Sequence, residues 1–248
     1  MFDDFRKMIS VLLEEYKDSL DVKKTKKTGD EVFRAFVSSI VTQGRTGVET
    51  TLQKIERDPK FKRWKPEYFS TESGKRLLRL YIGHQRKVDT IHKESKRMLN
   101  SGLKKWIDDL LKDEIDIGLK TKDDFLKEIG FLDHFPIDRY YPPFLARTGL
   151  LSQFLSITKT DPGKFMRGLG DPECYESYKS LMIQLCRDSL EGLKYHDLDL
   201  SKNPGIVDMI IWRHCARAEE AFNVCGKEPN CLRCKIRDFC RYGSRKQL

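Results

Sequence analysis

The amino-acid sequence predicts an all-α fold, a helical array whose members are joined by short turns. Three observations predict it. Apolar residues recur at spacings of three and four along nearly every segment, runs of alternating β-branched residues are absent, and glycines or capping side chains border several of these segments. Hydrophobic residues make up 39% of the 248 positions, enough to build a core, which excludes a disordered protein.

The periodic segments before residue 130 predict seven helices. In Asp4–Tyr16 the side chains of Phe5, Met8 and Leu12 share one face. Asp30 is placed to cap Glu31–Thr42, which follows a basic linker. Gly83 is expected to stop one helix before the next begins. The other helices predicted here are about Gly47–Arg57, Glu72–Ile82, Arg86–Leu99, Lys104–Ile115 and Thr121–Ile129.

Beyond Pro136 the helical pattern continues. Three further helices are predicted, at Pro142–Thr148, Tyr175–Leu193 and Gly205–Phe222. We find no internal repeat and no low-complexity tract, so the chain does not read as a solenoid.

The positive charge of the chain is concentrated in two segments. Lys and Arg number 47 against 38 Asp and Glu, a net charge of +9. Residues 84–105 and 223–248 each carry a net +5, so the remainder is close to neutral. Two such patches suit a polyanion, most commonly nucleic acid. The alternative is a solvated helix face together with a basic tail.

The cysteines are expected to be reduced. The first ten residues contain Asp3 and Asp4 where a signal peptide needs basic residues, and no run of about 18 apolar residues exists. We therefore expect an intracellular protein, in the cytoplasm or nucleoid, with no membrane partner. In that compartment seven cysteines indicate metal ligation or free thiols rather than disulfides.

Four cysteines have a metal-ligand spacing. Cys225, Cys231, Cys234 and Cys240 form the pattern C-x5-C-x2-C-x5-C. Four thiolates can bind either a [4Fe–4S] cluster or a zinc ion. Zinc ribbons more often pair two short CxxC knuckles, so the single close pair here favours the cluster, with zinc as the alternative. The other cysteines, Cys174, Cys186 and Cys215, are predicted to be small core residues.

The central stretch and the tail resemble the helix-hairpin-helix DNA glycosylases, especially the endonuclease III branch with its iron–sulfur loop. The resemblance covers roughly residues 31–240. The cysteine loop is one residue shorter than the family's C-x6-C-x2-C-x5-C, but it keeps Pro229 and Asp238 in the family's places. The segment EIDIGLKT resembles the family hairpin L-P-G-V-G-x-K-T, with Ile115 and Asp116 as departures from it.

The resemblance implies a base-excision-repair DNA glycosylase with AP lyase activity. Such an enzyme flips a damaged or mismatched base out of double-stranded DNA and cleaves its N-glycosidic bond. Lys120 matches the catalytic lysine that attacks C1′ and forms a Schiff base, and Asp138, eighteen residues on, matches the aspartate that stabilises the positive charge on the sugar. Taken alone, Lys120 would be a surface lysine and Asp138 a helix cap or turn former.

The resemblance also implies DNA-binding residues. Gln43 corresponds to a residue that enters the duplex near the vacated base, and His84 or Gln85 lies where the family has its wedge loop. Gly118 matches the second hairpin glycine, which presents backbone N–H groups to a phosphate. Lys235 and Arg237, together with Arg241, would be held against the DNA backbone by the cluster, whose expected role is to shape this basic loop.

In the family two helical domains enclose the DNA. Mapped onto this chain, residues 26–138 form a six-helix domain with the hairpin, and residues 1–25 and 139–248 form a terminal domain that carries the cluster loop. We expect a monomer. Two alternatives stay open: a non-catalytic or monofunctional DNA-binding protein of the same fold, favoured by the carboxylate of Asp116, and a zinc-containing nucleic-acid module.

Overall fold

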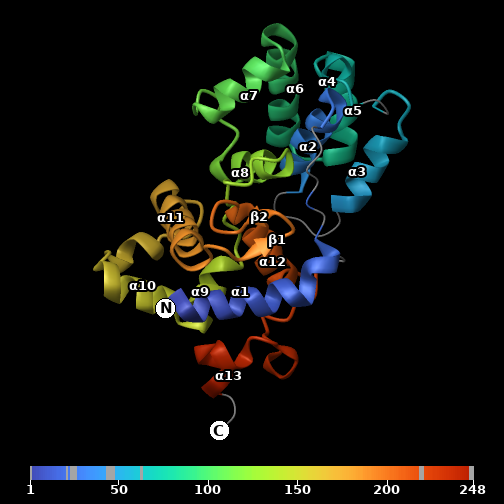
Figure 1. Cartoon of the computed structure of the whole chain (residues 1–248). Coiled ribbons are helices and arrows are strands. Elements are labelled where there is room, and N and C mark those ends of the chain that lie inside the picture. The colour runs from blue at the N-terminus through green and yellow to red at the C-terminus, as the bar shows by residue number, and fades with distance from the viewer. Residues whose placement is uncertain are drawn as a thin grey trace. The chain divides into compact units, whose positions relative to one another are not determined.

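The computed structural model describes residues 2–20, 22, 27–42, 48–61, 64–217 and 221–245. This part of the chain forms thirteen α-helices, four short 3-10 helices and one pair of two-residue strands (Figure 1). The prediction of an all-α fold is confirmed. None of the helices in these ranges is both long enough and apolar enough to span a membrane.

The chain divides into two compact units. Unit 2 consists of Lys24–Gly130, and unit 1 consists of Met1–Lys23 together with Phe131–Leu248. The predicted six-helix domain ran from 26 to 138, so the structure transfers residues 131–138, including Asp138, to unit 1. Hydrogen bonds explain this: the N–H of Gly205 donates to the carbonyl of Leu132, and the N–H of Ile137 donates to the hydroxyl of Tyr175.

The described residues of unit 2 form seven helices, of which the single-turn α4 has no counterpart among the predicted elements. The bounds are α2 Gly29–Val41, α3 Val48–Arg57, α4 Pro66–Phe69, α5 Glu72–Ile82, α6 Gln85–Ser101, α7 Leu103–Leu111 and α8 Leu119–Glu128. The cap of α2 is Thr28 rather than Asp30. The Thr28 hydroxyl accepts from the N–H of Glu31, and the Glu31 carboxylate accepts from the N–H of Thr28.

The core of unit 2 is aromatic. Phe36 lies edge-on to Trp106 and to Phe125, with ring centroids 5.0 and 5.9 Å apart, and all three side chains are fully buried. The indole N–H of Trp106 donates to the carboxylate of Glu94, which is only 1% exposed. This bond satisfies a buried donor and a buried acceptor at once, so it fixes α7 against α6.

Unit 1 is built from both ends of the chain. Its elements are α1 Phe2–Tyr16, η1 Lys17–Ser19, α9 Tyr141–Thr148, α10 Leu150–Thr158, η2 Pro162–Phe165, α11 Pro172–Ser189, β1 Lys194–Tyr195, β2 Leu198–Asp199, α12 Pro204–Cys215, η3 Cys231–Arg233, η4 Arg237–Phe239 and α13 Arg241–Arg245. Helix α1 packs on α11 and α12 (Figure 1). Arg6 donates to the carbonyls of Ser189 and Glu191, which ties α1 to the end of α11.

The largest difference from the predicted helices is the end of α12, which precedes the cysteine segment. The prediction extended this helix to Phe222, but it ends at Cys215 and Ala216 is extended. The N–H groups of Val224 and Cys225 both donate to the carbonyl of His214, so the chain folds back onto the helix end. Helix α10 and the β1–β2 pair, which lie in the stretch 150–200, were not predicted as elements.

Candidate functional site

The four cysteines of the predicted ligand pattern line one small pocket in unit 1. Cys225, Cys231, Cys234 and Cys240 share it with Arg147 and a few side chains of the same segment. Cys231 begins η3, Cys234 follows it, and Cys240 follows η4. The two short 3-10 turns η3 and η4 separate these cysteines, and all four side chains line the pocket despite their separation in sequence.

Arg147 holds the start of this segment. Its guanidinium, on α9, donates to the carbonyls of Cys225, Gly226 and Lys227 at 3.2, 2.6 and 3.1 Å, and it lies 3.7 Å from the sulfur of Cys225. The planar guanidinium has several N–H donors in fixed directions, so it can bind three neighbouring carbonyls at once, which the compact ammonium of a lysine does less well. Gly226 leaves no room for a side chain, because an added Cβ would lie 2.0 Å from the Asn223 side chain.

The surroundings shift the thiol pKa values in opposite directions. A hydrogen bond from the thiol of Cys215, followed by Arg147, lowers the pKa of Cys225. Burial raises the pKa of Cys234 and of Cys240. A bound cation or cluster has to displace the protons of these buried thiols, so metal binding releases protons and weakens as the pH falls.

The donor set suits a cofactor held by thiolates. The sulfurs approach one pocket, a cationic guanidinium is beside one of them, and carboxylates do not line the pocket. Within the described ranges, however, no three Cys, His, Asp or Glu side chains are grouped so that they could bind one metal ion. Binding of a [4Fe–4S] cluster, or of zinc as the alternative, by these four cysteines therefore stays a prediction.

A buried histidine on α12 reaches the same pocket. The Nε2 atom of His214 lies 3.6 Å from the sulfur of Cys234, and its Nδ1 atom lies 2.8 Å from the hydroxyl of Tyr16 on α1. Burial lowers the pKa of His214 to about 4, so the ring is neutral at physiological pH. The next residue, Cys215, is a buried core residue as predicted. Its thiol also forms a hydrogen bond with the side chain of Cys225.

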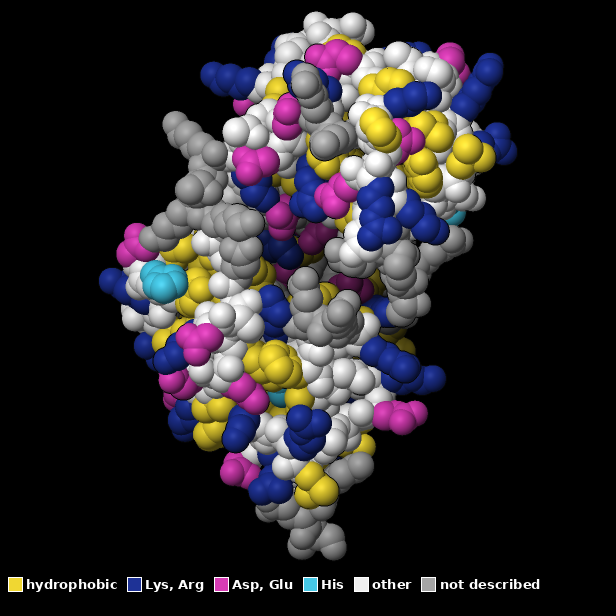
Figure 2. Space-filling model, turned by 90° about the vertical axis from the view of Figure 1, so that its right-hand side faces the viewer, with side chains coloured by type: hydrophobic (Ala, Val, Ile, Leu, Met, Phe, Trp, Pro, Cys, Tyr) yellow, Lys and Arg dark blue, Asp and Glu magenta, His cyan; other side chains and the backbone are white. Residues whose placement is uncertain are grey.

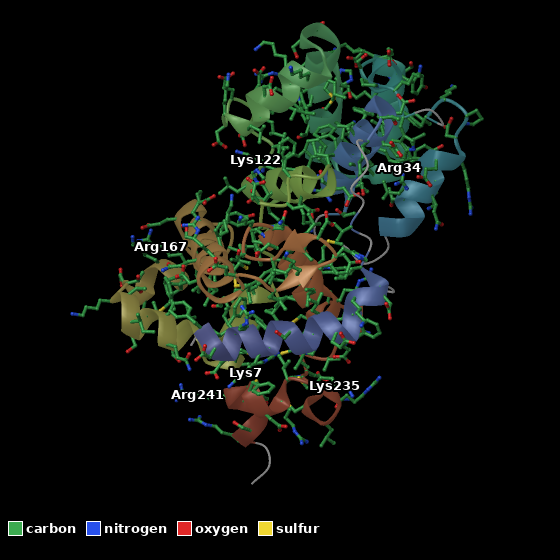
Figure 3. All side chains as sticks on the ribbon, viewed as in Figure 1. Lys7, Arg34, Lys122, Arg167, Lys235 and Arg241 are labelled. Atoms are coloured by element: carbon green, nitrogen blue, oxygen red, sulfur yellow. The ribbon has the colours of Figure 1, made fainter. Side chains whose placement is uncertain are left out.

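The predicted hairpin lies between α7 and α8 in unit 2. Gly118 precedes α8 with φ 83°, a backbone conformation that disfavours any residue with a side chain. Lys120 is half-buried in the first turn of α8. In the connecting loop Asp116 is exposed, and Asp113 forms an ion pair with Lys122 of α8, which is labelled in Figure 3.

Asp138 belongs to unit 1 and precedes α9. It is half-buried, and its carboxylate accepts a hydrogen bond from the N–H of Arg139 at 2.6 Å. Its carbonyl accepts from the N–H of Tyr141. The N-terminal cap of α9 is Tyr140, so Asp138 forms a turn before the helix rather than its cap. The side chain of Tyr141 is buried and donates to Asp208.

The predicted wedge loop joins α5 to α6. Gly83, with φ 65°, ends α5, and His84 directly precedes α6. Both His84 and Gln85 are exposed, and the amide of Gln85 donates to Asp89 one turn along α6. Gln43, the third predicted residue that enters the duplex, lies outside the described residues.

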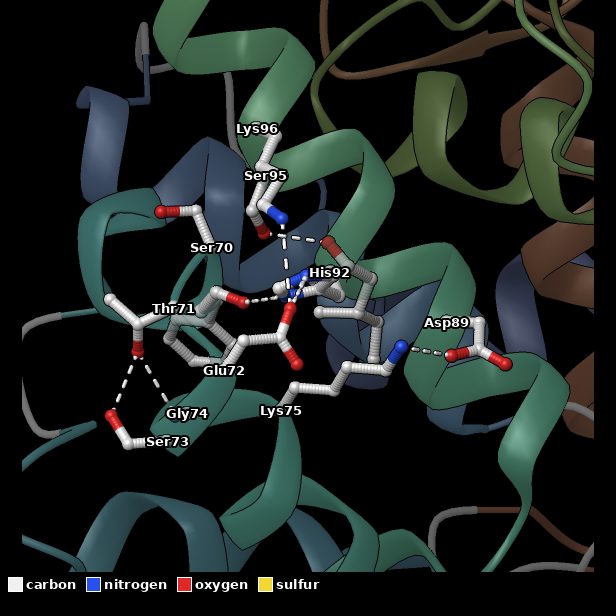
Figure 4. A network of polar contacts seen from close by, with 12 residues as sticks. Ser70, Thr71, Glu72, Ser73, Gly74, Lys75, Asp89, His92, Ser95 and Lys96 are labelled. Carbon is white, nitrogen blue, oxygen red and sulfur yellow. Dashed lines mark hydrogen bonds and ion pairs between the residues drawn. The ribbon is translucent and has the colours of Figure 1, made fainter.

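The basic segment 84–105 is partly neutralised by carboxylates of neighbouring helices. Lys93, Lys96, Arg97 and Lys105 line an open groove on α6 and α7. Lys93 pairs with Glu94, Lys96 with Glu72, and both Arg97 and Lys105 with Asp109. Four basic side chains thus face three carboxylates, two of them contributed by α5 and α7, and Figure 4 shows the part of this network around Glu72.

The C-terminal patch keeps its charge. Lys227, Arg233, Lys235 and Arg241 are exposed around the cysteine pocket, and Figure 3 labels Lys235 and Arg241 on this segment. Arg237 is half-buried and pairs with Asp238 at 3.5 Å. Leu232, which is 89% exposed, adds an apolar side chain to this surface. In Figure 2, basic and apolar side chains lie close together at this end of the molecule. This patch is the stronger candidate for a nucleic-acid interface.

The sequence analysis missed Tyr16 and His214, which are 198 residues apart. The spacing of the cysteines carries no information about a histidine eleven residues before Cys225 or a tyrosine on the first helix. The only available signal was their polar tips in otherwise apolar helical faces, which is ambiguous because a buried histidine is often only structural.

We predict that Arg147→Met lowers the free energy of unfolding of the protein by about 3 kcal/mol. The change leaves three carbonyls without their charged donor, and a hydrogen bond to a charged group contributes about 1.5–3 kcal/mol. Arg147→Lys should retain part of this stability. The measurement is urea unfolding followed by circular dichroism, with Arg187→Met, an exposed residue of α11, as the control that should change little. Equal stability of Arg147→Met and the control would contradict the assignment.

Comparison with known proteins does not assign the chain to a family. No protein-family model matches the chain, and neither a curated protein nor a solved structure is significantly similar to it.

Proposed function

We propose that the protein is a base-excision-repair DNA glycosylase with AP lyase activity. Lys120 is its nucleophile, Asp138 stabilises the positive charge that develops on the sugar, and the four cysteines hold a [4Fe–4S] cluster. The observation that carries the proposal is the shared pocket of Cys225, Cys231, Cys234 and Cys240 within an exposed basic surface. A thiolate cofactor beneath cationic side chains fits a structural support for a phosphate-binding loop.

The hairpin supports the same proposal. A glycine with positive φ before α8 leaves the first N–H groups of the helix without a side-chain cap. Such N–H groups are suited to a phosphate oxygen. Lys120 in the first turn then lies next to any phosphate bound there, where a nucleophile for the neighbouring sugar is required.

The chemistry assigns complementary roles to the two residues. As the C–N bond breaks, positive charge grows on the sugar, and a carboxylate close to C1′ lowers the energy of that state. The amine of Lys120 adds to C1′ and forms a Schiff base, which acidifies the 2′ position and permits β-elimination of the 3′ phosphate. The nitrogen must be deprotonated at the moment of attack.

A second candidate is a non-catalytic DNA-binding protein. Asp113, Glu114 and Asp116 are exposed in the hairpin loop, where Lys112 is the one basic residue; Lys122 of α8 pairs with Asp113 and leaves Glu114 and Asp116. Negative charge opposes a close phosphate at this loop. This alternative retains the basic surface and the cofactor but predicts DNA binding without release of any base.

We predict that borohydride traps a covalent complex between the protein and DNA. The test uses duplexes that each hold one oxidised pyrimidine, oxidised purine, mismatched thymine or abasic site. Lys120→Gln should lose the trapped complex, while Lys122→Gln, a neighbouring lysine of the same helix, should retain it. Asp138→Asn should slow base release. The lyase assignment is wrong if no duplex is trapped, and the residue assignment is wrong if Lys120→Gln still traps.

We also predict that the two basic segments differ in their contribution to DNA binding. Neutralising Arg233 and Lys235 together should weaken binding and reduce the slope of log K against log salt by about 2, because each lost phosphate contact removes about 0.9. Neutralising Lys93 and Lys96 should change the slope little, since their charges are already paired. The measurement is a salt titration of binding to undamaged duplex, and equal slopes for the two double variants would contradict the prediction.

A further inference from the structure

Three polar groups from distant parts of unit 1 form a buried chain that ends at a cysteine of the pocket. The hydroxyl of Tyr16 lies 2.8 Å from Nδ1 of His214, and Nε2 of the same ring lies 3.6 Å from the sulfur of Cys234. Tyr16 is 1% exposed and His214 is fully buried. Buried polar atoms are costly without partners, so these contacts account for the position of both side chains.

Whether Cys234 is a thiol or a thiolate determines the direction of both hydrogen bonds in this chain. A thiol can donate to Nε2, in which case Nδ1 carries the ring proton and donates to the Tyr16 oxygen. A metal-bound thiolate can only accept, so Nε2 must carry the proton and the Tyr16 hydroxyl must donate to Nδ1. The two contacts can form in either direction, so the chain suits the cysteine in both its free and its ligand state.

The backbone fixes the histidine relative to the cysteine segment. The carbonyl of His214 accepts from the N–H groups of both Val224 and Cys225. Tyr16 is held by stacking on Phe222 with ring centroids 4.9 Å apart, and the adjacent Arg213 donates to the carbonyl of Ser19. The imidazole therefore cannot turn away from the pocket without disturbing the junction of α1, α12 and the segment after α12.

We propose that His214 is a positioning residue for the cofactor: held by Tyr16, it donates its Nε2–H to the thiolate of Cys234 and thereby raises the reduction potential of the cluster and slows its loss. The inference rests on the cofactor assignment in the proposed function. A hydrogen bond to a ligating sulfur withdraws electron density from it, and such bonds are among the determinants of cluster potential. Arg147 supplies the corresponding donor on the other side, at Cys225.

The experiment compares full-length proteins that have been loaded with iron and sulfide under anaerobic conditions. The variants are His214→Leu, which removes the donor, His214→Gln, whose amide can restore an N–H near the same place, and Tyr16→Phe, which removes the group that orients the ring. The control is His92→Leu, because His92 is a buried histidine of unit 2 bonded to the carbonyl of Phe69. The two measurements are the reduction potential by voltammetry and the rate of iron transfer to a chelator.

We expect His214→Leu to shift the potential to more negative values and to release iron about tenfold faster than the wild type, the lower end of the usual effect of such outer-shell partners. Tyr16→Phe should shift both quantities in the same direction by less, and His214→Gln should lie closest to the wild type. His92→Leu should leave both unchanged. If His214→Leu fails to fold, the other two variants still test the inference. The reduction potential should then fall, and iron release should become faster, from the wild type to His214→Gln or Tyr16→Phe.

Two outcomes overturn the inference in distinguishable ways. Loaded wild type and loaded variants with the same potential and the same rate of iron release would refute the role of His214 but leave the cofactor assignment intact. A wild-type protein that takes up no cluster under these conditions would refute both. A wild-type protein that binds the cluster normally but shows no glycosylase activity in the lesion assay would refute only the proposed reaction.

Discussion

The fold of unit 1 depends on the buried contact between Tyr16 and His214. This contact joins the first helix to the helix that precedes the cysteine segment, so residues from opposite ends of the sequence close one unit. Each group supplies the other with a hydrogen-bond partner, and an unpaired phenol or imidazole is costly to bury in an apolar interior. The position of His214 in turn sets the path of the chain after α12, since its carbonyl receives the N–H groups of Val224 and Cys225.

Short elements make up the described part of the segment after α12. Residues 221–245 contain two 3-10 turns and the five-residue α13, and Leu232 is exposed whereas Val224 and Ile236 are buried. In small domains a metal centre commonly stabilises segments with so little regular structure. Arg147 and His214 approach the pocket from α9 and α12, and a cofactor bound by the four thiols would join these contacts into one rigid, positively charged surface.

Periodicity and cysteine spacing predicted the helical class, most helix positions and the four residues of the pocket, because these features are local in sequence. Contacts between distant segments could not be predicted. The basic excess of residues 84–105 looked like a polyanion site, but Glu72 and Asp109 from neighbouring helices pair with it in space. In the same way Cys215 looked like an isolated core thiol, and only the fold shows its hydrogen bond to the side chain of Cys225. The end of α12 was predicted too late in the sequence. The helical pattern continues past Cys215, but the chain turns back there and the N–H groups of Val224 and Cys225 donate to the carbonyl of His214.

Iron and sulfide analysis after anaerobic reconstitution tests the proposal that Cys225, Cys231, Cys234 and Cys240 together hold one [4Fe–4S] cluster. We expect about four iron and four sulfide per chain, with the visible absorption of a cluster. Serine at any of the four positions should reduce this content sharply, whereas Cys174→Ser and Cys186→Ser, at buried positions on α11, should retain it. One tightly bound zinc ion per chain without sulfide, or full cluster content in all four ligand variants, would contradict the claim.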